Sequence, residues 1–100
     1  MKFEIQKKIK YPFRGKEKKS LVELREILKM KRFTEEELFN EFYNICQKLE
    51  IKNTDFFKTA YEAIIGKEKG PRLASLILAI GKDKIIKLLE QIKWKIILAT

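Results

Sequence analysis

The sequence predicts an all-α protein, a compact bundle of about five helices with an extended basic N-terminal arm. From Leu21 onward, apolar residues recur at the three- and four-residue spacing of amphipathic helices. Helix-start signals, glycines and a proline divide these stretches from one another. The chain has 100 residues and is 45% hydrophobic, which is typical of a single domain with one core.

Residues 1–19 are predicted to form the basic extended arm, and residues 20–100 the helical domain. Apolar residues occupy alternate positions around Phe3 and Ile5 and again near Tyr11, as in a half-buried strand. Pro12 and Gly15 then interrupt any regular element.

Two capping boxes predict the starts of the first two helices. Ser20 with Glu23 and Thr34 with Glu37 have the spacing at which two side chains satisfy each other's backbone N–H groups. The helices are expected over about 21–31 and 35–49.

Turn residues predict three further helices. One of residues 53–55 is expected to cap the third helix, which ends at Gly66. The fourth has Pro71 at its first position and runs to Ile80. Asp83 is expected to cap the last helix, whose apolar residues continue to the C-terminus.

The phases of these helices predict which side chains are buried. The lone cysteine, Cys46, is expected to be a small buried hydrophobe. The predicted core comprises Phe39, Phe42, Phe57, Tyr61, Ile64, Leu76, Ile80, Ile85 and Leu89.

Composition argues against catalysis and for an anionic partner. Histidine is absent, which removes the commonest general base and metal ligand, so no catalytic residue, metal site or cofactor is expected. Lys and Arg number 23 against 14 acidic residues, a net charge of +9. The net charge is +8 over residues 1–32, −4 over 33–65 and +5 over 66–100, which suggests one cationic surface built from the two chain ends.

No apolar run approaches the roughly 20 residues that a membrane-spanning helix needs, and Met1 to Lys10 is charged throughout. The chain is therefore expected to be cytoplasmic, without a membrane partner.

The stretch from Phe56 to Leu89 has a distinctive order of features. An aromatic helix is followed by a glycine–proline turn, an apolar helix, a Gly-Lys pair and another apolar helix. These features are carried by Phe56, Phe57 and Tyr61, then Gly66, Gly70, Pro71 and Arg72, then Gly81 and Lys82, then Ile85 to Leu89.

This order resembles the C-terminal anticodon-binding helical region of class I lysyl-tRNA synthetases and, more distantly, of glutamyl-tRNA synthetases. The resemblance covers roughly residues 33–92 and implies a non-catalytic domain that binds tRNA. It also implies the catalytic part of a synthetase as a partner. Self-association through the last helix is a separate expectation, which comes from the apolar residues of that helix. The HIGH-type ATP-binding motif of those enzymes cannot occur without histidine.

Five basic residues are the candidate nucleic-acid-binding site. Lys67, Lys69 and Arg72 surround the turn that opens the fourth helix, where free N–H groups and the helix dipole favour an anion. Lys82 and Lys84 flank the next helix start. The alternative is that the turn is purely architectural and the lysines are simply solvated.

Tyr11, Tyr43 and Trp94 are the aromatic residues most able to stand out and stack on RNA bases. Two other functions remain open. The apolar residues from Trp94 to Ala99 suggest a protein-interaction or oligomerisation module. Short helices and a basic surface also fit a helix-turn-helix DNA binder, although the helix after Arg72 has almost no polar face.

Overall fold

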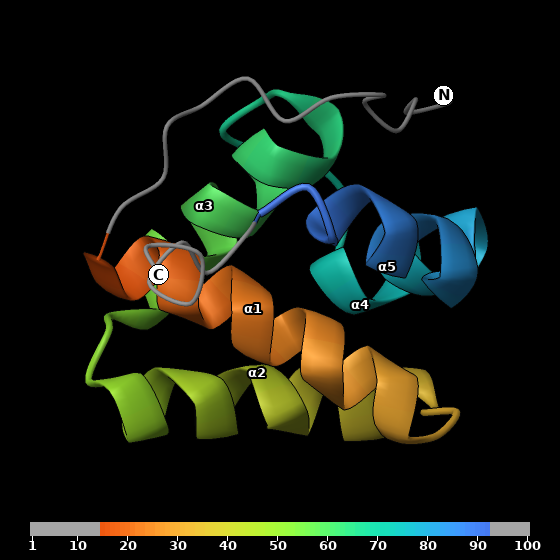
Figure 1. Ribbon diagram of the computed structural model, residues 1–100, viewed down its shortest axis with the longest axis horizontal. Coiled ribbons are helices and arrows are strands. Elements are labelled where there is room, and N and C mark those ends of the chain that lie inside the picture. Colours follow the sequence, from red (N-terminus) through yellow and green to blue (C-terminus); the bar gives the residue numbers. More distant parts are fainter. Residues whose placement is uncertain (1–14, 93–100) are drawn as a thin grey trace, which may run out of the picture.

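The computed structural model describes residues 15–92, and every regular element within them is a helix (Figure 1). The five helices are α1 (Gly15–Met30), α2 (Glu35–Leu49), α3 (Asn53–Ile65), α4 (Leu73–Ile80) and α5 (Lys82–Leu89). The predicted all-α class is confirmed. Residues 1–14, which belong to the predicted extended arm and include Tyr11, and the apolar residues from Trp94 to Ala99 lie outside the described part of the chain.

Helix α1 occupies the middle of the molecule, with α2 on one side and α3 and α5 on the other (Figure 1). Its apolar face consists of Leu21, Leu24 and Leu28, which are all buried. Arg25 ties this helix to the other end of the described chain, because its Nη1 atom donates to the Ile92 carbonyl oxygen at 3.2 Å. Helix α4 packs against α2 and α5 instead.

The start of α1 differs from the prediction. The helix begins at Gly15, so residues 15–19, which were predicted to belong to the arm, form its first turn and a half. Ser20 is fully buried inside the helix, and its hydroxyl donates to the Glu17 carbonyl oxygen at 2.7 Å. A serine in a helix interior can form its hydrogen bond with a backbone carbonyl of the preceding turn. The Ser-x-x-Glu spacing therefore did not mark a helix start.

The second capping box is confirmed. The Glu37 N–H donates to Thr34 Oγ1 at 3.1 Å, and the Thr34 N–H donates to Glu37 Oε1 at 3.0 Å. The hydrogen bond from the Thr34 backbone, with help from the nearby charge of Lys31, lowers the pKa of the Glu37 carboxyl below its ordinary value. The start of α2 is therefore fixed by its own sequence.

The other three predicted helix starts were wrong by one to three residues. Lys52, which makes no capping hydrogen bond through its side chain, precedes α3, and α4 begins at Leu73 instead of Pro71. Helix α5 begins directly after Gly81, so Asp83 lies in its first turn. Gly81 has φ 106° and ψ 130°, a conformation that suits glycine, and it ends one helix and starts the next without a loop between them.

Most of the predicted core is confirmed. Five of the nine residues are buried, namely Phe42, Ile64, Leu76, Ile85 and Leu89, and Cys46 is buried as well. Phe57, Tyr61 and Ile80 are half-buried. Phe39 was wrongly placed, because its side chain is 42% exposed. The apolar stripe of α2 is wider than the surface that its neighbours cover, and Phe39 lies at its open edge.

Candidate nucleic-acid interface

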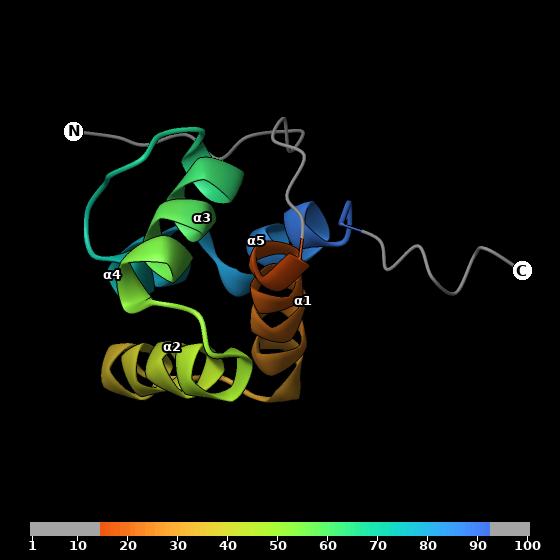
Figure 2. The same ribbon diagram turned by 90° about the vertical axis from the view of Figure 1, so that its left-hand side faces the viewer.

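The connector between α3 and α4 carries three of the five predicted site residues. Figure 2 shows that the connector runs outward from the end of α3 and then back to α4. The Tyr61 hydroxyl donates a hydrogen bond to the Pro71 carbonyl oxygen. Burial raises the pKa of the Tyr61 hydroxyl, against the effect of a backbone hydrogen bond at Leu73, so the group remains a neutral donor. The connector is thus fastened to α3.

The connector packs closely against α3 at Gly70. A Cβ atom at this position would lie 3.0 Å from Ile65 Cδ1 and 3.2 Å from two ring carbons of Tyr61. Gly70→Ala should therefore lower the free energy of unfolding by about 1–3 kcal/mol, as measured by urea denaturation.

A second variant removes the crowded atom. Ile65→Val deletes Cδ1, so Gly70→Ala should cost less in the Ile65→Val background than in the wild type. Strictly additive losses would show that the contact is not the cause.

The three basic residues of the connector do not form an unopposed cationic cluster. Lys67 and Lys69 are exposed. The Arg72 side chain is 83% exposed, and its Nη1 atom lies 3.3 Å from Glu35 Oε2. Glu35 belongs to the acidic first turn of α2, which also contains Glu36 and Glu37. Part of the charge of Arg72 is therefore already balanced.

Lys82 and Lys84 lie in a different place. The Lys82 Nζ atom donates to the Lys31 carbonyl oxygen at 3.3 Å, which joins the start of α5 to the α1–α2 loop. A surface depression of about 520 Å³ opens at this junction. We call it the basic hollow; it is lined by Arg32, Phe33, Leu78, Ile80, Gly81, Lys82, Asp83 and Lys84.

The charged residues of the basic hollow are three cations and the single anion Asp83. Among residues 15–92, no carboxylate forms an ion pair with Arg32 or Lys84. Residues from the first and the last basic segments of the sequence meet here, in agreement with the cationic surface that the charge distribution suggested.

The structure therefore divides the five predicted residues into two groups, which lie at opposite ends of α4. Eight residues of α-helix span about 12 Å. Arg32 and Phe33 were not predicted as site residues, because they lie in a loop far from residue 82 along the chain. The spacing of helical residues does not reveal which loop folds against which helix start.

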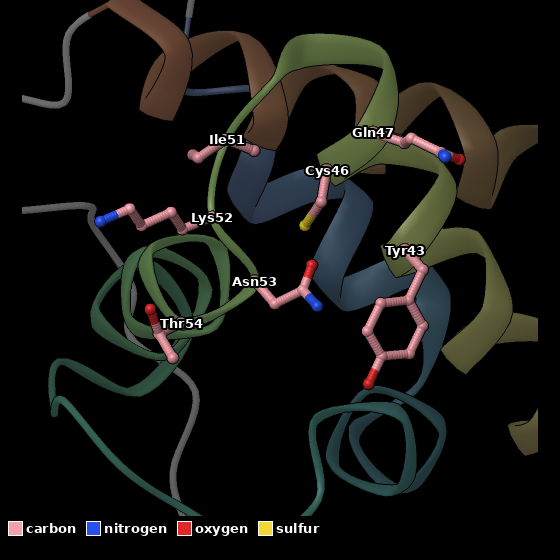
Figure 3. A pocket seen from close by; sticks show the side chains of 7 residues that line it. All are labelled: Tyr43, Cys46, Gln47, Ile51, Lys52, Asn53 and Thr54. Atoms are coloured by element: carbon pink, nitrogen blue, oxygen red, sulfur yellow. The ribbon is translucent and has the colours of Figure 1, made fainter.

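A second depression, of about 600 Å³, lies between α2 and α3 (Figure 3). We call it the α2–α3 hollow; it is lined by Tyr43, Cys46, Gln47, Ile51, Lys52, Asn53 and Thr54. Tyr43 is 39% exposed, so this one of the three predicted stacking residues does stand out from the surface.

Residues 15–92 contain neither a metal-binding cluster nor a membrane-spanning helix. No group of three or more His, Cys, Asp or Glu side chains there could hold a metal ion. None of the helices in this range is both long enough and apolar enough to cross a membrane.

The sequence is similar to a known family and to several named proteins. Residues 2–93 match the family described as "Anticodon binding domain". Lysine–tRNA ligase of Borrelia garinii subsp. bavariensis is 42% identical over 77 residues, which cover 74% of this chain and 15% of that protein. Lysine–tRNA ligase of Borreliella burgdorferi is 43% identical over 74 residues, or 71% of this chain and 14% of that protein.

A lysine–tRNA ligase of Methanosphaera stadtmanae is 32% identical over 89 residues, which cover 87% of this chain and 17% of that protein. The chain thus spans about one sixth or less of each of these three relatives. The similarity concerns one part of a much longer enzyme.

Proposed function

Because the chain belongs to the anticodon binding domain family, we propose that it binds tRNA as a non-catalytic domain. It would correspond to the anticodon-binding end of a class I lysyl-tRNA synthetase, either as part of such an enzyme or as a separate relative. The names of the ligases that it resembles make the tRNA for lysine the first one to test.

The basic hollow is the observation that carries the proposal. Arg32, Lys82 and Lys84 gather cations around one depression, and a guanidinium group can hold a phosphate through two parallel hydrogen bonds. Phe33 adds an aromatic wall beside them. Contacts of this kind fix a nucleic acid by its backbone and make its binding depend on salt.

The connector residues Lys67, Lys69 and Arg72 are proposed as a weaker, second phosphate contact. The ion pair between Arg72 and Glu35 must open before the guanidinium can bind a phosphate. The basic hollow is therefore expected to contribute more to affinity than the connector.

The proposed partners and cellular location follow from the proposed tRNA binding. A catalytic synthetase core is a proposed partner, and a second copy of the chain is an alternative that would use the apolar residues near Trp94. A tRNA-binding protein of this kind is expected in the cytoplasm, which fractionation of cells can check.

The proposal is tested by titrating tRNA with the 100-residue chain at several salt concentrations. Arg32→Gln with Lys84→Gln should reduce the slope of log affinity against log salt by about 2, because two phosphate contacts are lost. Affinity at 0.1 M salt should fall on the order of 10- to 100-fold. Lys82 is left unchanged because it also ties α5 to the α1–α2 loop.

A matched control removes the same charge elsewhere. Lys87 is an exposed lysine outside the basic hollow, and Lys87→Gln should affect binding much less than Lys84→Gln does. Equal losses in these two single variants would show that only total charge matters. Wild-type binding that does not respond to salt would contradict the proposal itself.

A further inference from the structure

The α2–α3 hollow has a different chemistry from the basic hollow. Of the seven residues that line it, only Lys52 is charged, and none is acidic. Its other polar groups are amides and hydroxyls, which hydrogen-bond in defined directions. Base edges in RNA are recognised by such groups, whereas phosphates are bound mainly by charge.

Tyr43 supplies an aromatic surface that is held in place. Its ring lies edge-on to Phe39, with centroids 4.9 Å apart and planes at 87°, and edge-on to Phe57 at 6.5 Å and 84°. These neighbours restrict the ring while leaving 39% of the residue exposed. An aromatic ring fixed in this way is a stacking platform that loses little entropy when a base binds.

Asn53 supplies a donor and an acceptor next to that ring. In Figure 3 its amide extends into the space between the Cys46 thiol and the Tyr43 ring. The residue is exposed, and within residues 15–92 no hydrogen bond engages its side chain. A carboxamide can accept and donate at once, and so pair with a base edge through two hydrogen bonds.

The remaining walls fit a neutral, flat ligand. Cys46 is buried at the inner side of the hollow, and burial raises the pKa of its thiol, so the wall there carries no charge at neutral pH. The Lys52 side chain points away from Tyr43 in Figure 3, which leaves its ammonium group for a phosphate beyond the base. The volume of about 600 Å³ lies within the usual range for small-molecule pockets.

We propose that the α2–α3 hollow takes one unpaired nucleobase of RNA, which stacks on Tyr43 and is read along its edge by Asn53. This proposal rests on the proposed tRNA binding and adds to it the place where sequence is read. The basic hollow then supplies affinity that depends on salt, and the α2–α3 hollow supplies discrimination between bases.

The test measures the affinity of the 100-residue chain for the tRNA for lysine and for versions with single abasic nucleotides in the anticodon loop. Tyr43→Ala and Asn53→Ala should each weaken binding of the intact tRNA on the order of 10-fold. The slope of log affinity against log salt should not change. Both variants should bind one particular abasic tRNA as the wild-type chain does, because the base that they read is already missing.

Matched controls separate recognition from folding. Tyr43→Phe keeps the ring and should retain most of the affinity. Asn44 is an exposed asparagine of α2 outside the hollow, so Asn44→Ala should bind like the wild type. Circular dichroism verifies that each variant is folded, and if Tyr43→Ala unfolds, the Asn53→Ala and Asn44→Ala pair still decides.

The two proposals fail in different ways. If Asn53→Ala binds every tRNA as Asn44→Ala does, or loses affinity equally for all abasic versions, the hollow does not read a base. The proposed function would survive this result as long as the basic-hollow variants still weaken binding. Absence of tRNA binding by the wild-type chain would overturn both proposals.

Discussion

Phe42→Ala should lower the free energy of unfolding by about 3–5 kcal/mol, which is typical of a large aromatic residue removed from a core. Phe42 is fully buried on α2, and its ring lies 5.5 Å from that of Phe56 and 5.9 Å from that of Phe57. Its loss would open a cavity where α2 meets α3, and neither helix can move in without giving up other contacts. Urea denaturation followed by circular dichroism measures the effect.

Phe39 provides the matched control, because it has the same side chain on the same helix, one turn earlier. It is 42% exposed, so Phe39→Ala should cost only about 1 kcal/mol. Equal losses for the two variants would mean that the helix presents a different face to the core. A large loss of unfolding free energy in Phe39→Ala alone would mean that Phe39, and not Phe42, is the buried residue.

Gly81→Ala should have the second large effect, a loss of about 1–3 kcal/mol. No heavy atom lies within 4 Å of a Cβ atom built at Gly81, so the cost comes from the backbone conformation at φ 106° and not from crowding. With the added methyl group, the chain either keeps this strained backbone conformation or changes the angle between α4 and α5. Thermal or urea unfolding gives the loss.

A second substitution at Gly81 distinguishes backbone strain from side-chain crowding as the cause of this loss. Gly81→Ser adds a larger side chain to the same open space, so it should cost about as much as Gly81→Ala. A loss that grows with side-chain size would point to crowding. The basic hollow offers a second readout, since Gly81 lines it together with Lys82 and Lys84. Weaker tRNA binding by a still-folded Gly81→Ala chain would link the turn to that site.

Local signals in the sequence predicted the number and order of the helices well, and the starts of individual helices less well. Thr34 acts as the sequence indicated because its capping partner, Glu37, lies within the same helix turn. Ser20 has the same spacing to Glu23, yet it lies inside α1, where it is fully buried and its hydroxyl donates to the Glu17 carbonyl oxygen. The burial of Ser20 depends on the helices packed around it, which cannot be read from spacing.

The candidate site shows a similar limit. Lys82 and Lys84 were predicted from their place at a helix start, and they do lie together in one hollow. Arg32 and Asn53 were missed because their significance depends on elements distant in sequence, the start of α5 for one and the Tyr43 ring for the other. Exposed polar residues in short connectors adjoining apolar helices were the only signal that could have drawn attention to them.

The central position of α1 has a consequence for synthesis of the chain. Among the five helices α1 is synthesised first, but its apolar face is covered jointly by α2, α3 and α5, and α5 ends only at Leu89. The nascent polypeptide therefore carries the uncovered Leu21, Leu24 and Leu28 face until nearly all of the described residues have left the exit tunnel. Native structure can close around α1 only after α5 has also emerged from the tunnel.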